Sequence, residues 1–489
     1  MFLFVVFEVV FGLIIPVLLY VIVVYIYHIW ECQRYPPGPF PLPVIGNYNL
    51  LANDPVKALC DLEIIYGDVF SLSLGTVRVV VVSSHESIYD VLVGDGSNFS
   101  GRPREYSSLL FTGGFENLSH MDNNPLTKKI RKVFYSKLKT NGSILAHNEN
   151  IVKHESELLH QRLLQNEGSV TNLRYEIDLC IVNSICSIIF GNRLSDTCEV
   201  HEILKATRLL LKNLSNIEIM HYLPWMRFFL LKKQNEISES RNICKFWIQT
   251  QLHKRKKSLK NENISDILLN LWDQQKQENP NEEQYRMILV ELVMAGSETT
   301  AATITWLIFY LLHWPHYQSI LYKEIKNVCG DQYPTFNDIK SMPIMQATIL
   351  ETLRLSSVVP LSLSHKAVNN AKINKFTIPK DTIIITNLWG VHHNEKYWEK
   401  PFEFNPMRWL DKNGELSTAK RLGYFPFSAG PRGCIGESFA RMQMFIICSR
   451  LIKDFSFELP QSGETPKLDG DIGITLTPLP YNAVAKQRT

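Results

Sequence analysis

The stretch FPFSAGPRGCIGESFA, Phe425 to Ala440, places one of the nine cysteines of the chain among three glycines. A cysteine that serves as a metal ligand must be a thiolate rather than a thiol. Apolar residues at helical spacing begin at Phe439, so we expect Cys434 to lie at the N-terminus of a helix. Backbone N–H groups and the helix dipole favour a negative charge at that position.

The glycines and the arginine beside this cysteine suit a bulky, anionic cofactor. Gly433 and Gly436 would leave room for a flat group to approach the sulfur, and Gly430 would permit a tight turn. Arg432 offers a fixed cation to an anionic group nearby. Together these requirements predict a loop that presents the Cys434 sulfur to a haem iron, and they would be unusual for a structural cysteine.

Composition limits the class of protein. The chain has 489 residues, 45% of them apolar, and its formal net charge of +3 gives no indication of nucleic acid as a partner. The cysteines are scattered without CxxC pairs. This pattern argues against a disulfide scaffold or a zinc module and favours reduced thiols in a compartment that faces the cytosol.

The N-terminal segment predicts a membrane anchor. No charged residue occurs from Val9 to Tyr27, and these 19 positions span roughly 28 Å as a helix, about one bilayer core. A cleavable signal peptide fits poorly, because Glu8 stands in place of a basic region and no small-residue cleavage site follows. We therefore expect a single uncleaved transmembrane anchor over residues 1–30 and a stiff, proline-rich linker over residues 31–45.

Residues 46–489 are expected to form one large domain that is mainly α with a minor β portion. RVVVVSS, Arg78 to Ser84, follows SLSLG and predicts a pair of short strands. Helical periodicity then dominates from about Lys128 to Cys329. No internal repeat or low-complexity linker divides this part of the chain, so we expect a single domain.

The longest helical pattern, from about Gln284 to His313, contains AGSETT within an otherwise apolar stretch. Gly296 costs about 1 kcal/mol relative to alanine in a helix interior. Glu298 and Thr299 add polar groups at the same place. Either these are satisfied core residues, or the helix is loosened where a ligand lies against it.

A second helix, roughly Ile344 to Leu355, contains ETLR. Glu351 and Arg354 are three residues apart, so they share one helix face and can form an ion pair. Their apolar neighbours favour a partly buried pair that fixes the local geometry. The ExxR pattern alone is frequent by chance.

These motifs together resemble those of the cytochromes P450. FSAGPRGCIG, Phe427 to Gly436, matches the haem-binding signature F-x-x-G-x-R-x-C-x-G of that family at every fixed position. AGSETT resembles the oxygen-activating segment of the family's long central helix, ETLR resembles its ExxR pair, and FNPMRW resembles the element that completes a triad. The resemblance covers the whole chain and implies the cytochrome P450 fold, a single large haem domain behind a transmembrane anchor. It also implies haem as the cofactor, with Cys434 as the axial ligand of the iron, Phe427, Arg432 and Gly436 at the cofactor, and Glu351, Arg354 and Arg408 as a structural triad.

Within the family, the chain resembles the animal microsomal branch that contains steroid hydroxylases and xenobiotic-metabolising enzymes. PPGP after the anchor, FSGRP, SHKA and WGVHHNEKYW carry this similarity. It implies that Arg102, His365 and Arg432 bind the haem propionates, whereas the alternative for each is a solvent-facing cation. Related enzymes carry W-x-x-x-R on the helix that crosses the haem edge, but this chain has Thr127 at the tryptophan position and keeps Arg131. We expect the threonine hydroxyl to remain able to bond a propionate, although the stacking surface of an indole is lost.

The reaction that the resemblance implies is insertion of one atom of O₂ into a lipophilic organic substrate. Cys434 as a thiolate favours O–O cleavage, while Thr299 and Glu298 would hold water and relay protons. The chain carries no dinucleotide or flavin fingerprint, so electrons must come from an NADPH-cytochrome P450 reductase, with cytochrome b5 as a candidate second donor. The alternatives are a P450-fold isomerase or dehydratase that acts on peroxides without O₂ or reductase, and a non-enzymatic haem sensor or carrier.

The resemblance also indicates where substrate, membrane and reductase bind. Steroids, fatty acids and xenobiotics all remain open as substrates, because apolar walls indicate only lipophilicity. YLPWMRFFLL, Tyr222 to Leu231, predicts a second membrane contact. The microsomal resemblance and the reduced cysteines imply that the protein lies on the endoplasmic reticulum membrane with its domain in the cytosol. KKIRKVFYSKLK, Lys128 to Lys139, holds six basic residues and no acidic one and predicts the reductase surface. The residues expected in the substrate pocket are Ala295, Val358, Val359 and Ile474, and those expected to contact the reductase are Lys132, Lys137 and Lys139.

Overall fold

Helix α13 (Glu282–His313) is apolar almost all the way round and lies in the middle of the domain, as such a composition requires. It packs against α8 (Leu173–Phe190), α15 (Pro343–Ser356) and α17 (Glu437–Asp454), and these four helices contribute much of the largest hydrophobic core. The helices predicted around AGSETT and ETLR are therefore confirmed, and both lie in this core.

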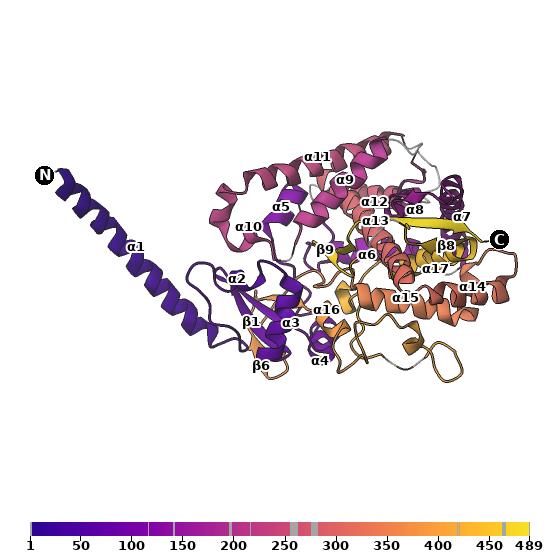
Figure 1. Cartoon of the computed structure of the whole chain (residues 1–489). Coiled ribbons are helices and arrows are strands. Elements are labelled where there is room, and N and C mark those ends of the chain that lie inside the picture. Colours follow the sequence, from indigo (N-terminus) through magenta and orange to yellow (C-terminus); the bar gives the residue numbers. More distant parts are fainter. Residues whose placement is uncertain are drawn as a thin grey trace.

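The structure, a computed structural model, describes residues 2–115, 117–139, 142–194, 198–215, 217–254, 263–274, 282–417, 419, 421–461 and 466–488. In this part of the chain helices predominate, and α1 (Phe2–Cys32) projects from the end of the domain near the main sheet (Figure 1). The other α-helices are α2 (Tyr48–Leu51), α3 (Pro55–Tyr66), α4 (His85–Tyr89), α5 (Tyr106–Thr112), α6 (Pro125–Lys137), α7 (Gly142–Gln165), α9 (Cys198–Asn213), α10 (Ile219–Tyr222), α11 (Leu231–Lys254), α12 (Ile264–Gln274), α14 (His316–Cys329) and α16 (Leu388–His392). Short helical turns are η1 (Asp90–Gly94), η2 (Pro224–Phe228), η4 (Phe336–Ser341), η5 (Pro406–Trp409) and η6 (Gly430–Arg432).

The main sheet has four strands in the order β1-β2-β7-β4 and contains the predicted strand pair. β1 (Val69–Leu74) and β2 (Val77–Val82) are antiparallel, β2 is parallel to β7 (Ile383–Thr386), and β7 is antiparallel to β4 (His365–Lys366). Alternate residues of β2 face two separate cores, so the strand is buried on both faces, and Val79 to Val82 form an unbroken apolar run rather than an alternating pattern. The smaller sheets consist of β3 (Val170–Thr171), β11 (Ala483–Gln487) and β8 (Phe455–Glu458), of β5 (Ala371–Ile373) and β6 (Phe376–Ile378), and of β9 (Gly470–Ile472) and β10 (Leu476–Pro478).

The proline-rich segment after α1 was expected to be a stiff spacer, but it lies on the domain. The Ser71 hydroxyl donates to the Pro36 carbonyl at 2.6 Å, and the Ser71 N–H donates to the Pro37 carbonyl at 2.9 Å. A Cβ at Gly38 would lie 1.9 Å from the Ser71 carbonyl oxygen, so only glycine lets the segment approach β1 this closely. The segment is therefore bonded to the sheet and fixes the place where α1 leaves the domain.

Helix α1 contains the predicted apolar run, and its C-terminal part contacts the domain. The Tyr25 hydroxyl donates to the Pro41 carbonyl at 2.7 Å, and the Arg78 guanidinium donates to the His28 carbonyl. Among the described residues, α13 is the one helix that is long and apolar enough by composition to cross a membrane, and most of it is buried in the core. The described apolar part of α1, Leu18–Glu31, is shorter, so the transmembrane anchor stays a prediction.

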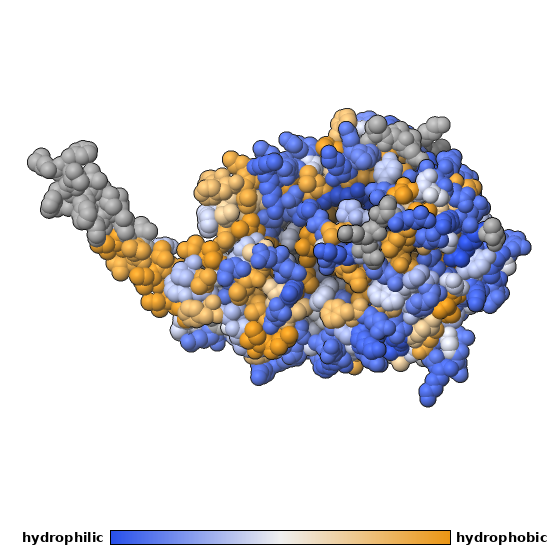
Figure 2. Space-filling model, viewed as in Figure 1, coloured by the Kyte–Doolittle hydropathy of each residue, from blue (hydrophilic) through white to orange (hydrophobic). Residues whose placement is uncertain are grey.

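Apolar side chains are exposed on the side of the domain from which α1 projects (Figure 2). Phe228 and Phe229, in and just after η2, are 81% and 75% exposed, and Trp225 is 43% exposed. The first two residues of the predicted membrane segment, Tyr222 and Leu223, are instead buried. The segment is therefore split between residues that pack on the domain and residues that present an apolar surface.

Candidate active site

Cys434 lies in the loop between η6 and α17, two residues before Gly436, the N-cap residue of that helix. The predicted position at a helix N-terminus is therefore confirmed. The Cys434 N–H donates to the Phe427 carbonyl at 2.9 Å and closes the loop. Gly430 has a φ of +67°, and a Cβ there would lie 1.8 Å from the Leu92 carbonyl oxygen, so the tight turn requires glycine.

The other two glycines of the loop differ in what surrounds them. A Cβ on Gly436 would lie 4.0 Å from Cys434 Sγ, so the glycine leaves this side of the sulfur uncovered. A Cβ on Gly433 would meet backbone atoms of Ala429 and Gly430 at 3.3 Å. Crowding within its own turn therefore explains Gly433, rather than the predicted room for a cofactor.

The Cys434 side chain is exposed, yet desolvation by the surrounding protein raises the pKa of its thiol. Both statements hold for a side chain that faces a hollow enclosed by the protein, because a small molecule can touch the sulfur while bulk water is mostly excluded. The backbone groups of Gly436 and Glu437 and the Arg131 guanidinium act in the opposite direction and favour the thiolate. The loop therefore presents an accessible sulfur whose thiolate form is stabilised by nearby backbone groups and by Arg131.

Three buried groups of potential positive charge, Arg102, Arg432 and His365, form a set that we call the cation set. Arg102 Nε, Arg432 Nη1 and His365 Nε2 are buried without a hydrogen-bond partner. The pKa of Arg102 is lowered by burial and by the charge of Arg432, and the pKa of His365 is lowered by burial and by both arginines. Their other nitrogens donate to backbone carbonyls, from Arg102 to Ser364 at 2.6 Å, from Arg432 to Met121 at 2.9 Å and from His365 Nδ1 to Phe99 at 2.7 Å.

The unpartnered nitrogens of the cation set would be satisfied by an anion. A carboxylate among the three groups would accept from both arginines and would favour the protonated imidazole of His365, whose Nε2 could then donate as well. The orphaned nitrogens, the exposed sulfur of Cys434 and the uncovered side at Gly436 together fit haem, which carries both an iron and two propionates. The alternative reading, in which each of these three residues is a cation that faces solvent, does not hold, because all three are buried.

Arg131 ties α6 to the loop of Cys434, because its Nη2 donates to the Gly433 carbonyl at 2.6 Å. Thr127, one turn earlier, is fully buried, and its hydroxyl donates to the Asp122 carbonyl at 2.8 Å. A hydroxyl has one hydrogen and an ionised carboxylate can only accept. The expectation that Thr127 could bond a propionate is therefore wrong, since its hydrogen is used at the start of α6.

Glu351 accepts five hydrogen bonds from four residues in the core between α15 and η5. Arg354 Nη2 and Arg408 Nε lie 2.8 Å and 3.0 Å from Glu351 Oε1, and the side chains of Glu351 and Arg354 are both fully buried. Trp409 Nε1 donates to Oε2 at 2.9 Å, and the Asn405 N–H donates to Oε1 at 3.0 Å. The predicted triad is thus brought together, and loss of one member of such a buried network costs about 3–5 kcal/mol.

Helix α13 continues without a break through AGSETT. A Cβ on Gly296 would meet the Ile185 side chain of α8 at 2.8 Å, so the glycine allows close helix packing and does not loosen the helix. The Thr299 hydroxyl donates to the Ala295 carbonyl one turn earlier, at 2.8 Å. Ala295 is exposed in the middle of α13, although Val293, Met294 and Ser297 around it are buried, which is consistent with a position facing a hollow.

Glu298, the neighbour of Thr299, is held by arginines of α8 and α9. Its carboxylate lies 2.6 Å from Arg174 and 3.9 Å from Arg208, and both arginines also pair with Asp178. Glu298 is buried in this network. Glu298 and Thr299, which were expected to act together in a proton relay, therefore make separate sets of contacts.

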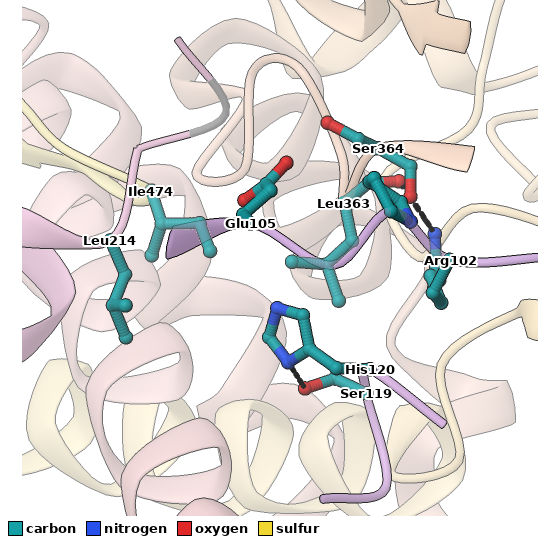
Figure 3. A pocket seen from close by; sticks show the side chains of 9 residues that line it. Arg102, Glu105, Ser119, His120, Leu214, Leu363, Ser364 and Ile474 are labelled. Atoms are coloured by element: carbon teal, nitrogen blue, oxygen red, sulfur yellow. Dashed lines mark hydrogen bonds between the residues drawn. The ribbon is translucent and has the colours of Figure 1, made fainter. Parts of the chain in front are cut away.

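The predicted pocket residues are not all in one place. Val358 and Val359 lie in or against the main core. Ile474 lines a hollow next to the cation set, together with Glu105 and His120, which carry no sequence signal of a site (Figure 3). In the sequence, Glu105 is simply a polar residue just before a helix, and His120 lies in a loop outside every motif. The residues that line this hollow, called the polar hollow below, are Arg102, Pro103, Glu105, Ser119, His120, Leu214, Leu363, Ser364 and Ile474.

Comparisons with known proteins identify the family. A sequence profile described as Cytochrome P450 matches residues 36–484. The chain is 30% identical over 470 residues to Steroid 17-alpha-hydroxylase/17,20 lyase of Rana dybowskii, a match that covers 93% of this chain and 91% of the relative. It is 31% identical over 497 residues to Cytochrome P450 2U1 of Bos taurus, covering 93% and 89%, and 30% identical over 453 residues to Steroid 17-alpha-hydroxylase/17,20 lyase of Cavia porcellus, covering 89% of each.

The chain belongs to the cytochrome P450 family. The predicted fold, a mainly helical haem domain with a minor β portion, is therefore confirmed, and so is haem as the cofactor. The protein is a P450 monooxygenase, an oxidoreductase of the same kind as its microsomal animal relatives.

Proposed function

We propose that this monooxygenase inserts one atom of O₂ into a lipophilic substrate of the steroid class, with electrons from NADPH-cytochrome P450 reductase at the endoplasmic reticulum membrane. The single observation that carries the proposal is the exposed Cys434 sulfur just before the N-terminus of α17, in a domain whose buried cation set has nitrogens without a hydrogen-bond partner. Bound haem supplies the O₂ chemistry. The residues of the chain hold the cofactor, manage protons and exclude water.

Cys434 would ligate the haem iron, and the cation set would hold the propionates. Arg131 fixes the loop through Gly433 and so holds the Cys434 sulfur in position. Phe427, half-buried at the other end of the loop, accepts the Cys434 N–H at its carbonyl, and its ring lies 4.8 Å from the Arg441 guanidinium. Both contacts hold the loop in one conformation.

Thr299 and Glu298 are the proposed proton-handling residues. The bond from the Thr299 hydroxyl to Ala295 leaves the hydroxyl oxygen free to accept from a water molecule in the hollow. The Glu298 carboxylate is held by Arg174, so its part in the relay depends on this ion pair. This arrangement favours a monooxygenase over a P450-fold isomerase, which needs no proton delivery to O₂.

A steroid-class substrate is favoured by the relatives and is compatible with the walls of the site. Two of the relatives reported above are named for hydroxylation of steroids. Ala295 on α13 and Ile474 at the polar hollow offer apolar surface, as lipophilic substrates require.

The reductase surface is proposed to be α6. Lys128, Lys129, Lys132 and Lys139 are exposed on or just after this helix, and Arg131 in the same helix contacts the Cys434 loop. A basic surface at this position would attract an acidic redox partner and raise the rate of encounter. Cytochrome b5 is a candidate for the same surface.

The membrane location is proposed from α1 and the exposed apolar residues of η2. Two N-x-S/T sequons of the domain support a cytosolic orientation, because Asn117 is fully buried and Asn213 is almost so. In the lumen, a glycan attached to either asparagine before folding would be incompatible with its buried position in this fold.

The test of the proposed function is reconstitution with reductase, NADPH and a panel of steroids. We expect hydroxylated product that depends on reductase, NADPH and O₂ together. Conversion of an organic peroxide without reductase or O₂, and no reductase-dependent product, would favour the isomerase. Haem binding without any turnover would favour a sensor or carrier.

A further inference from the structure

The polar hollow combines apolar walls with polar groups whose hydrogen-bonding capacity is not filled (Figure 3). Leu214, Leu363 and Ile474 provide apolar surface. Glu105 Oε1 and Ser364 Oγ are buried, and beyond their contact with each other neither atom has a hydrogen-bond partner. Burying a polar group in this way costs free energy unless a ligand or water molecule completes its hydrogen bonds. The hollow is therefore an incomplete polar site in an apolar setting.

Glu105 is the N-cap residue of α5, but its carboxyl group does not cap the helix. The first free N–H of that helix, from Tyr106, is taken instead by His221 Nδ1 at 3.3 Å. The Glu105 side chain is only 8% exposed and borders the hollow. Burial raises its pKa to about 8, with the Ser364 hydroxyl and then Arg102 acting in the opposite direction, so near neutral pH the carboxyl group is mostly protonated. It can then both donate and accept a hydrogen bond.

His120 presents a hydrogen-bond acceptor from the opposite side. Its backbone N–H donates to Asn117 Oδ1 at 3.2 Å, and since an N–H needs an acceptor, the amide orientation of Asn117 is fixed. The same oxygen lies 2.8 Å from His120 Nδ1, which must therefore carry the hydrogen. Burial lowers the pKa of His120 to about 3, so the ring is neutral and Nε2 has a free lone pair. This nitrogen points toward the centre of the hollow (Figure 3).

We propose that the polar hollow binds a neutral hydroxyl group at one end of the lipophilic substrate, with His120 Nε2 as the acceptor and Glu105 as the donor. The inference rests on the proposed function and narrows its substrate class to lipophilic alcohols. A hydroxyl group satisfies both residues at once, because it carries one hydrogen and two lone pairs.

Other end groups fit less well. A ketone can accept from Glu105 but has no hydrogen for His120. A hydrocarbon leaves both residues unpaired. An ammonium group has no lone pair to accept a hydrogen bond from Glu105, and a carboxylate would place a lone pair against that of His120 Nε2.

The first test compares three matched probes in the full-length holoenzyme: androstanol, androstanone and androstane. Dissociation constants are read from the spectral shift on binding. We expect the alcohol to bind at least about tenfold more tightly than the hydrocarbon, with the ketone in between. Equal affinity for the alcohol and the hydrocarbon would overturn the inference, whatever the variants do.

The second test uses variants, each checked for the thiolate-type absorption band as a measure of correct folding. His120→Phe should weaken binding of the alcohol about tenfold and leave the affinity for the hydrocarbon unchanged. Glu105→Leu should do the same, whereas Glu105→Gln, which keeps a neutral donor and acceptor, should retain most of the preference. Leu214→Val, the matched control on the apolar wall, should affect all three probes alike. Equal weakening of all probes by His120→Phe would assign this residue a packing role only.

The two proposals can fail separately. Reductase-dependent oxidation of the probes without preference for the alcohol would overturn the polar site and leave the proposed function intact. Preferential binding of the alcohol without any oxidation of it would contradict the proposed function instead. No binding of any probe would contradict both.

Discussion

The Arg131 guanidinium donates to the Gly433 carbonyl at 2.6 Å and joins the lysine-rich helix α6 directly to the loop that carries Cys434. The proposed electron-entry surface and the proposed iron ligand are therefore parts of one hydrogen-bonded unit. A partner docked on α6 would lie against the thiolate side of the cofactor. This relationship gives the reductase proposal a structural basis beyond the local concentration of charge.

Reversal of Lys132, Lys137 and Lys139 to glutamate should slow reduction of the iron by the reductase several-fold at low salt. The reason is the loss of electrostatic attraction, which acts mainly on the rate of encounter. The difference from wild type should shrink above roughly 0.5 M salt, where screening is strong. Stopped-flow reduction kinetics measure the effect, and peroxide-driven turnover should stay normal.

The matched control reverses three exposed lysines in and just after the β5–β6 hairpin, Lys372, Lys375 and Lys380. It changes the net charge by the same amount at another surface. Equal slowing in both variants would show a general charge effect, and unchanged kinetics in the α6 variant would place the docking surface elsewhere.

Thr299→Ala should leave haem binding intact but lower the yield of product per NADPH, with peroxide released instead. The change removes a hydroxyl whose oxygen can hold a water molecule beside Ala295. Thr299→Ser keeps the hydroxyl and should retain most of the coupling. The ratio of product formed to NADPH consumed measures this coupling. A normal ratio in the alanine variant would show that Thr299 is a core residue only.

Replacement of Trp225, Phe228 and Phe229 by serine should weaken liposome binding of the protein from which α1 has been deleted. These side chains are exposed, and their transfer into the membrane interface is favourable by the apolar area that they bury. Flotation with vesicles measures the bound fraction. Phe402→Ser, at another position that is 62% exposed, is the control and should have no effect. Undiminished binding of the triple variant would show that the segment does not contact the membrane.

Glu63 gives a prediction about pH. Burial and the nearby charge of Asp68 raise its pKa from 4.5 to about 7. The folded protein thus holds this proton more tightly than the unfolded chain, so stability falls as pH rises from about 4.5 to about 7 and then levels off. Glu63→Gln, which stays neutral, should raise the melting temperature by a few degrees near pH ~8 and much less near pH ~5.

The control for this measurement is Glu395→Gln, at an exposed position. It should have the same small effect at both pH values. A Glu63→Gln protein whose gain in melting temperature does not depend on pH would show that this carboxyl group does not titrate as described.

Features set by local sequence could be predicted, and features set by distant contacts could not. The β1–β2 pair, the helices around AGSETT and ETLR and the helix N-terminus beside Cys434 follow from periodicity and turn residues that lie close together in the chain. The cation set could be placed only through the family resemblance, because its members come from separate segments.

The contacts that the sequence did not reveal involve alternative partners for polar groups. Glu298 pairs with Arg174 from a helix more than a hundred residues away, and the Thr127 hydroxyl is used by its own turn. Neither choice is visible in a motif, because a motif gives the type of side chain and not the direction in which it points. The polar hollow was missed for the same reason, since Glu105 has the position of a helix cap without that role.

The most direct test of the account is the absorption spectrum of the reduced, CO-bound protein in the Cys434→Ala variant. Wild type should show the band that is characteristic of thiolate-ligated haem, and the variant should lack it, because no other described cysteine is placed in this loop. Cys329→Ala, at a partly exposed cysteine outside the site, should keep the band. Persistence of the thiolate band in Cys434→Ala would contradict the central claim that this sulfur is the ligand of the iron.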